Sequence, residues 1–205
     1  MQIFVDDIPD LASADPGSRL GPLLAQIRQW LNGEGLAVRE WVLDGEALTS
    51  ARQAELSDRP VDAFGRLDVR TSDRFELSLD LISGAQRALA ALAKKHVRTA
   101  GLFQEGREAE ALLALRECID DWNGLMERTG ASSAICGVPL SETARSRLRE
   151  LAGVLAQVDG AFRQGDALRL ADLVEHDLRP RLADWETLLD GQIEAVRALQ
   201  PPRMN

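Results

Sequence analysis

The side chains best suited to metal binding or nucleophilic catalysis are scarce, since the 205 residues include only two histidines and two cysteines. His96 lies on or beside the apolar stripe of a predicted helix, and His176 lies between two acidic residues of another. Neighbouring positions on a helix point about 100° apart, so those acids and His176 cannot converge on one metal ion. We therefore interpret both histidines as structural residues at the surface or at the edge of the core.

The cysteines and the acidic pairs offer no stronger catalytic pattern. Cys118 is followed by an apolar residue and is typical of a small core side chain, whereas Cys136 falls in a predicted loop without a base to activate its thiol. The pairs Asp6–Asp7 and Asp120–Asp121 are more typical of solvated acidic faces than of metal ligands or general acids. P-loop and G-x-G-x-x-G motifs are also missing. We expect no catalytic residue, no metal and no cofactor, and hence a protein that is not an enzyme.

Charge and hydropathy narrow the class of partner. Lys and Arg number 24 against 33 Asp and Glu, a formal net charge of −9. Nucleic acids and anionic lipids bind clustered positive charge, so we expect neither a nucleic-acid partner nor a membrane partner. No run approaches the ~20 apolar residues of a membrane span, and the start, Met1–Asp7, has no basic region typical of a signal peptide. These features predict a soluble, cytoplasmic, acidic protein.

A change of pattern near residue 72 predicts two domains. Before it, short apolar strands and one amphipathic helix alternate with turns that contain Gly and Pro. These elements fall at residues 3–5, 19–31, 36–43 and 67–69. Their order predicts a small α+β module at residues 1–71, β-grasp-like, in which a short sheet packs on one helix.

After residue 72 the chain consists of long stretches with apolar residues three and four positions apart, the pattern of amphipathic helices. Asp73, with Glu76 three residues later, predicts the cap of the first helix, although Ser72 is a competing cap. Pro180 predicts a kink or break in the last helix. The expected helices cover about 73–103 and 107–128, then begin near Ser141 and after Gly165, with a loop at 130–139. Such helices bury their apolar faces in an antiparallel four-helix bundle, at residues 72–205. The predicted fold class is thus α+β.

Two tryptophans, Trp122 and Trp185, occupy apolar positions of these helices. The first interpretation is that both are large core residues that close the ends of the bundle. The alternative is that one of them lines a groove that receives a partner helix, a known way for apolar helical surfaces to bind.

Four stretches of the second segment share the pattern of a known protein family. They are the helix entry at Ser72–Leu77, the stretch Leu81–Leu89 with its Gly-Ala pair, the middle stretch Gly106–Leu113 and the closing Leu182–Trp185. Over residues 72–188 the chain thereby resembles the flagellin export chaperones, small cytoplasmic helical bundles that hold the C-terminal part of flagellin before secretion. The resemblance implies a bundle that binds a helical segment of a secreted protein.

We therefore expect a non-enzymatic protein-binding module, of the secretion or flagellar chaperone or adaptor type, that grips a partner segment in a helical groove. The expected groove floor lies where the family-like stretch is concentrated, at Leu81, Ile82, Ala85 and Leu89. The same four side chains could equally form the buried core of the bundle, and the sequence does not separate these two interpretations.

Two further functions stay open. In the first, the bundle binds a small anionic molecule, or acts on it as an enzyme, between its helices. The candidate residues for that site are Arg87, Arg98, Arg116 and His176. In the second, the chain is a structural or oligomerising subunit, for example a homodimer.

Overall fold

We describe the protein from a computed structural model, which places residues 1–9, 15 and 17–200. The remaining residues of the two predicted domains lie outside the described part of the chain. The structure divides into two compact units, Met1–Leu77 and Ser78–Asn205. The sequence placed this boundary six residues earlier, after residue 71. No linker marks the change, because strand β5 (Arg66–Asp73) continues directly into helix α3 (Arg74–Gln104).

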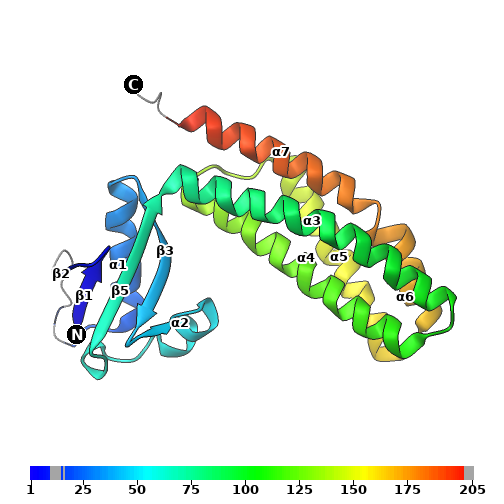
Figure 1. Cartoon of the computed structure of the whole chain (residues 1–205), viewed down its shortest axis with the longest axis horizontal. Coiled ribbons are helices and arrows are strands. Elements are labelled where there is room, and N and C mark those ends of the chain that lie inside the picture. Colours follow the sequence, from blue (N-terminus) through cyan, green and yellow to red (C-terminus); the bar gives the residue numbers. More distant parts are fainter. Residues whose placement is uncertain (10–14, 16, 201–205) are drawn as a thin grey trace. The chain divides into compact units, whose positions relative to one another are not determined.

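The N-terminal unit is a mixed five-stranded sheet with a long helix against one face (Figure 1). The strands lie in the order β2-β1-β5-β3-β4, with β1 and β5 parallel and the other neighbours antiparallel. This mixed sheet on a helix is the β-grasp-like arrangement that the sequence predicts. Besides β5, its elements are β1 (Gln2–Val5), β2 (Ile8–Pro9), α1 (Leu20–Gly33), β3 (Leu36–Leu43), β4 (Glu46–Ala47), α2 (Ser50–Leu56) and the short 3-10 helix η1 (Val61–Ala63).

Apolar periodicity explains how the sheet and α1 meet. The buried residues of α1 are spaced three or four apart, and they are Leu20, Leu23, Leu24, Ile27 and Leu31. In the parallel pair of strands, Ile3 lies opposite Leu67 and Val5 opposite Val69, and all four are buried. Alternate residues of a strand point to one face, so these pairs form the sheet side of the core. The sequence missed β2, β4 and α2, which are short and contribute no buried residue within their bounds.

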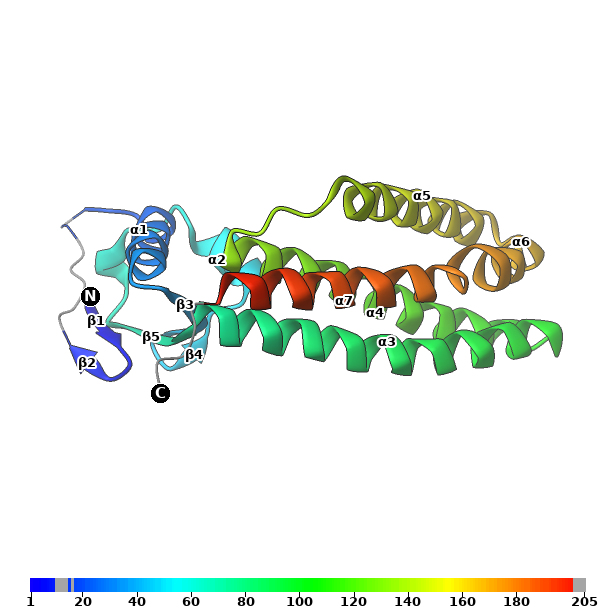
Figure 2. The same ribbon diagram turned by 90° about the horizontal axis from the view of Figure 1, so that it is seen from above.

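The second unit is a bundle of four helical segments, confirming the predicted fold class. Figure 2 shows α3, α4, α5 and α7 side by side. In addition to α3, the elements are α4 (Glu108–Cys136), α5 (Glu142–Gln164), α6 (Ala167–Asp172), the π-helical turn η2 (Leu173–Leu178) and α7 (Arg181–Leu199). None of the helices in the described ranges has the length and apolar character needed to cross a membrane.

Most helix ends lie where the sequence predicts them. The carboxylate of Asp73 accepts hydrogen bonds from the backbone N–H groups of Phe75, at 2.8 Å, and Glu76, at 3.0 Å, and so caps α3. The Ser141 hydroxyl accepts from the N–H of Ala144 and caps α5. The last segment is broken at Pro180, as expected from its missing N–H donor.

One helix end was predicted wrongly. The sequence places a loop at 130–139, but α4 continues to Cys136 and ends only at Gly137, which adopts the left-handed backbone conformation with φ of 65°. The last turns of α4 bury small and polar side chains, Thr129, Ser132 and Cys136, in place of the large apolar residues that signal a helix. Cys136 is therefore a buried helical residue rather than an exposed loop residue.

The middle of the bundle contains the two tryptophans. Trp122 is completely buried and Trp185 is 1% exposed. Their rings meet edge to face, with centroids 5.8 Å apart. Both are core residues, as in the first of the two interpretations that the sequence allowed, but they lie in the middle of the bundle and not at its ends.

Candidate functional site

The bundle has helices of unequal length. Helices α3 and α4 have 31 and 29 residues, whereas α5 has 23. At a rise of 1.5 Å per residue, α5 is roughly 9–12 Å shorter than its neighbours. The chain from Gly137 to Ser141 covers this length without forming a helix (Figure 2). We call this end of the bundle, where the non-helical connection takes the place of further turns of α5, the open end.

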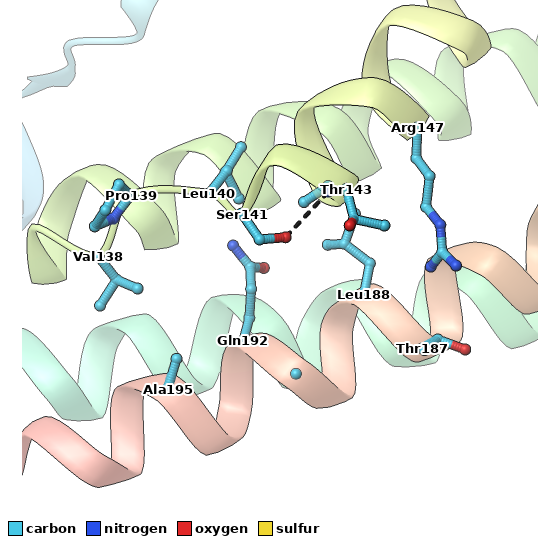
Figure 3. A pocket seen from close by; sticks show the side chains of 12 residues that line it. Val138, Pro139, Leu140, Ser141, Thr143, Arg147, Thr187, Leu188, Gln192 and Ala195 are labelled. Atoms are coloured by element: carbon cyan, nitrogen blue, oxygen red, sulfur yellow. Dashed lines mark hydrogen bonds between the residues drawn. The ribbon is translucent and has the colours of Figure 1, made fainter.

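A groove of about 330 Å³ lies between this connection, the start of α5 and α7 (Figure 3). We call it the α5–α7 groove. Its lining residues are Val138–Ser141 from the connection, Thr143, Ala144 and Arg147 from α5, and Thr187, Leu188, Gly191, Gln192 and Ala195 from α7. The α7 residues recur every three to four positions and so share one face of that helix. The walls are mostly apolar or small, which is typical of ligand-binding grooves in proteins.

Gln192 is the most unusual residue of the groove. It is only 8% exposed. Its Nε2 donates to the backbone carbonyl of Thr129 on α4 over 3.4 Å, which fixes the orientation of the amide because a carbonyl can only accept. Its Oε1 is buried and has no hydrogen-bond partner among the described residues. Figure 3 shows the amide reaching from α7 toward Ser141, so this oxygen faces the groove.

The buried hydroxyl groups of this part of α3 and α4 all have hydrogen-bond partners. The hydroxyls of Ser78, on α3, and Ser132, on α4, lie 2.6 Å apart. The Thr129 hydroxyl donates to the carbonyl of Leu125 over 2.7 Å. All three residues are fully buried. Leaving a buried acceptor unpaired costs about 1–3 kcal/mol, so the free oxygen of Gln192 stands out against these satisfied neighbours.

The other end of the groove is marked by Arg147. Its guanidinium donates to the backbone carbonyl of Asp184 over 2.8 Å and lies 3.4 Å from the Asp184 carboxylate. Asp184 and Gln192 are eight residues apart on α7, a distance of about 12 Å along the helix. The α5–α7 groove therefore joins a buried acceptor at one end to a charged pair at the other.

The sequence did not find this site. Gln192 lies between Leu189 and Val196 in the apolar repeat of α7, and all three are buried. A polar residue at such a position was the signal available. The same holds for Thr129 and Ser132 on α4, which follow Leu125 at the same helical spacing.

The residues that the sequence proposed as a groove floor lie mainly in the core. Ile82 and Ala85 are completely buried, which favours the second of the two interpretations that the sequence left open, a place in the core of the bundle. Leu81 is half-buried. Leu89 is 7% exposed and borders a smaller groove that α7 lines with Leu182 and other residues. The amphipathic pattern that marks a groove also marks core, and here the core accounts for it.

The alternative anionic site has no comparable geometry. Arg87, Arg98 and Arg116 are exposed, as is His176. His176 borders a shallow depression with Glu175 and Arg179. Asp121, one of the acidic candidates, forms an ion pair of 2.7 Å with Lys95. Among the described residues, no three His, Cys, Asp or Glu side chains are grouped so that they could hold a metal ion.

His96 is buried in the middle of the bundle, away from the surface. The indole N–H of Trp122 donates to its Nε2 over 3.1 Å, so a neutral imidazole carries its proton on Nδ1. Nδ1 makes no hydrogen bond of normal geometry to a described residue. Burial, with a smaller contribution from the charge of Arg179, lowers the pKa of His96 to about 4, although the Val174 carbonyl and Asp121 act in the opposite direction. His96 is therefore an uncharged core residue at neutral pH.

Comparisons with known families divide the chain much as the structure does. Residues 80–188 match the family model of a domain of unknown function, DUF8042. Residues 1–73 match that of the TP0873 N-terminal domain. The searches found no matching curated protein and no matching solved structure. The first match covers most of the bundle, including Arg147 and the first part of the α7 side of the groove.

Proposed function

The chain belongs to the DUF8042 family, whose function is unknown, and from its own side chains we propose that it is a non-enzymatic protein-binding module. In this proposal the helical unit holds a segment of another protein in the α5–α7 groove. The proposal retains the cytoplasmic location expected from the sequence.

The observation that carries the proposal is the free Oε1 of Gln192 in an otherwise apolar groove. An apolar wall with one buried acceptor favours an occupant that is itself largely apolar and brings one hydrogen-bond donor. Such an occupant removes apolar surface from water and pairs the orphaned oxygen at the same time.

The dimensions favour a polypeptide over a metabolite. On α7, Gln192 and Asp184, the partner of Arg147, are about 12 Å apart along the helix axis, a span that about four residues of extended polypeptide cover. The groove runs between the connection and α7, as Figure 3 shows by the side chains that line it. The resemblance of residues 72–188 to flagellin export chaperones supports the same class of partner, a helical segment of a secreted protein.

A selection experiment with displayed random peptides tests this function. The full chain is the target, and chains in which the groove is filled, Gly191→Trp or Ala195→Trp, are used for counter-selection. A Cβ added at Gly191 meets no neighbour within 4 Å, and far-UV circular dichroism checks that the larger indole leaves the fold intact. The matched control is Ala152→Trp, at an exposed position of α5 outside the groove.

We expect peptides whose affinity falls by about tenfold or more with the groove-filled chains and stays unchanged with Ala152→Trp. The proposal is wrong if no selected peptide distinguishes the groove-filled chains from the unmodified chain. A shift in melting temperature caused by a small anionic metabolite, and abolished by Gly191→Trp, would favour the small-molecule alternative instead.

A further inference from the structure

Helices α3 and α7 carry opposite charge where they lie side by side (Figure 2). From Gly84 to its end at Gln104, α3 contains four Arg or Lys residues and no acidic residue. Between Arg181 and Arg197, α7 contains four Asp or Glu residues and no basic residue. The two helices therefore differ in the sign of their charge along the length over which they are neighbours.

Two hydrogen bonds fix the register of this helix pair. Gln86 Nε2 on α3 donates to the Asp190 carboxylate on α7 over 2.9 Å. Gln104 Nε2, at the end of α3, donates to the Glu175 carboxylate in η2 over 3.4 Å. Residue numbers rise along α3 as they fall along η2 and α7, so the helices are antiparallel, and residues at the same level can be assigned.

Three charged residues near the middle of this pair have no partner in the described part of the chain. Glu186, one turn before Asp190, is level with Ala90 on α3. Arg87 and Lys94 flank Ala90 and lie within about 6 Å of the level of Glu186 along the helix axis. The charged side chains of Arg87, Lys94 and Glu186 are exposed, and none forms an ion pair or hydrogen bond with a described residue. Their charges are therefore available to another molecule.

An apolar groove of about 240 Å³ lies between α3 and α7 on the same face. We call it the α3–α7 groove. Its apolar lining residues are Leu89, Ala90, Ala93, Leu182 and Ala183, and Gln86 and Glu186 border them. Val97, one turn after Ala93 on α3, is 58% exposed. An apolar centre with charged residues at its margin is the composition of protein–protein interfaces.

The distribution of charge selects the partner. Most soluble oligomers are symmetric, and in a two-fold dimer a surface packs on a copy of itself. Packing α3 on α3 and α7 on α7 would bring like charges together, which costs binding energy. A two-fold axis parallel to the helices instead places α3 of each copy on α7 of the other. Arg87 and Lys94 of each copy then lie within about one turn of Glu186 of the partner subunit.

The size of the face is sufficient for such a dimer. Helix α7 has 19 residues, a length of about 28 Å, and two neighbouring helices are about 20 Å wide. A flat contact of this size buries about 560 Å² of each copy and about 1,100 Å² in total, just above the roughly 1,000 Å² of the smallest specific interfaces. We therefore expect a dissociation constant in the micromolar range.

We propose that the face formed by α3 and α7 binds a second copy of the chain, in a two-fold dimer that packs α3 of each copy on α7 of the other. This inference goes beyond the proposed function and does not depend on it. The α5–α7 groove lies on a different face of α7, with Gly191 and Gln192 in place of Ala183 and Glu186, so both surfaces can be occupied in one molecule.

The test uses charge reversals in the full chain. Arg87→Glu and Lys94→Glu each reverse a charge on α3, and Glu186→Arg reverses the charge that faces them on α7. Arg116→Glu, at an exposed position of α4, changes the net charge as much as Arg87→Glu does and is the matched control. Far-UV circular dichroism checks that each variant is folded. Sedimentation velocity at concentrations up to about 100 μM measures the association of each chain alone and of mixtures.

We expect the unmodified chain and Arg116→Glu to form dimers with similar dissociation constants. Arg87→Glu, Lys94→Glu and Glu186→Arg should each raise the dissociation constant by about tenfold or more, because the two-fold axis repeats every unfavourable contact. A mixture of Arg87→Glu and Glu186→Arg chains should associate nearly as well as the unmodified chain, since both contacts in the mixed dimer then join opposite charges.

Three results would overturn the inference. An unmodified chain that stays monomeric up to about 100 μM does not form this dimer. A dimer that Glu186→Arg leaves unchanged uses another face. Failure of the Arg87→Glu and Glu186→Arg chains to associate with each other excludes the packing of α3 on α7. None of these results affects the proposed function, because that function is tested with variants of the α5–α7 groove.

Discussion

The middle of the bundle and its open end each bury a polar residue. The two regions differ in how the hydrogen-bonding groups of that residue are placed. In the middle, His96 accepts a hydrogen bond from Trp122, whose ring also packs against Trp185. At the open end, Gln192 uses its amide nitrogen within the bundle and turns its oxygen to a groove. The comparison teaches that burial of a polar side chain is not enough to suggest a binding site. A free polar atom beside an accessible space is needed as well.

We expect the largest change in the free energy of unfolding from a substitution in the packed middle of the bundle. Trp185→Ala removes a 1% exposed indole and leaves a cavity next to Trp122. We expect the free energy of unfolding to fall by about 3–5 kcal/mol, a large part of the stability of a typical domain. Chemical denaturation followed by circular dichroism measures this. Leu168→Ala, at a residue that is 83% exposed, is the matched control and should change little; a Trp185→Ala chain as stable as this control would place Trp185 outside the core.

The next largest effect is a dependence of stability on pH, and it also concerns the middle of the bundle. Because burial lowers the pKa of His96 from 6.5 to about 4, the unfolded chain binds a proton between these values that the folded chain does not. The contribution of His96 to stability is complete above pH 6.5 and is lost as the pH falls toward 4, by about 3 kcal/mol.

The measurement for this prediction is denaturation at several pH values for the unmodified chain and for His96→Gln. Glutamine retains an acceptor for Trp122 but does not titrate. The difference in stability between the two chains should therefore change between pH 7 and pH 4. A difference that is independent of pH would contradict the assignment of a neutral, buried His96.

A smaller effect is expected at the wall of the groove. Gly191 lies inside α7, is exposed and has open space at the position of a Cβ. Gly191→Ala should raise the free energy of unfolding by about 0.5–1 kcal/mol, because alanine loses less backbone entropy in a helix. Thermal melting measures the change. A decrease would mean that the wall of the groove is closer to a neighbour than the structure has it.

The smallest effect on stability is expected for Gln192→Leu, although its effect on binding should be large. The substitution removes one long hydrogen bond to the Thr129 carbonyl and also removes an unpaired acceptor. These changes oppose one another, so we expect the free energy of unfolding to change by about 1 kcal/mol or less. Denaturation curves of the two chains provide the test. A loss as large as that of Trp185→Ala would make Gln192 a structural residue and remove the contrast between the two regions.

The packed middle was predictable from the sequence, and the open end was not. Trp122 and Trp185 lie in regular apolar repeats, and Asp73, Ser141 and Pro180 mark helix ends by well-understood local chemistry. Each of these features depends on residues close together in the chain. For that reason the bundle and its core residues follow from periodicity and capping.

The groove depends on a comparison of helix lengths, which local patterns do not provide. The small residues after Thr129 gave no apolar repeat, so the sequence ended the second helix near 128 and placed a loop at 130–139. Because the predicted second helix was too short, the difference in length between α4 and α5 could not be predicted. The tertiary packing of Thr129, Ser132 and Cys136 is what keeps these turns helical.

The π-helical turn η2 makes the bundle tolerant to a change in chain length at one place. Here the N–H of Arg179 bonds to the carbonyl of Val174, five residues earlier, while Leu173, Val174 and Leu178 all remain buried. Such a turn holds one residue more than an α-helical turn. Deleting the exposed His176 can convert it to ordinary α-helix and keep α6 and α7 in phase with their neighbours. Within the regular α5, the deletion of one residue rotates everything after it by about 100° and turns the apolar face away from the core.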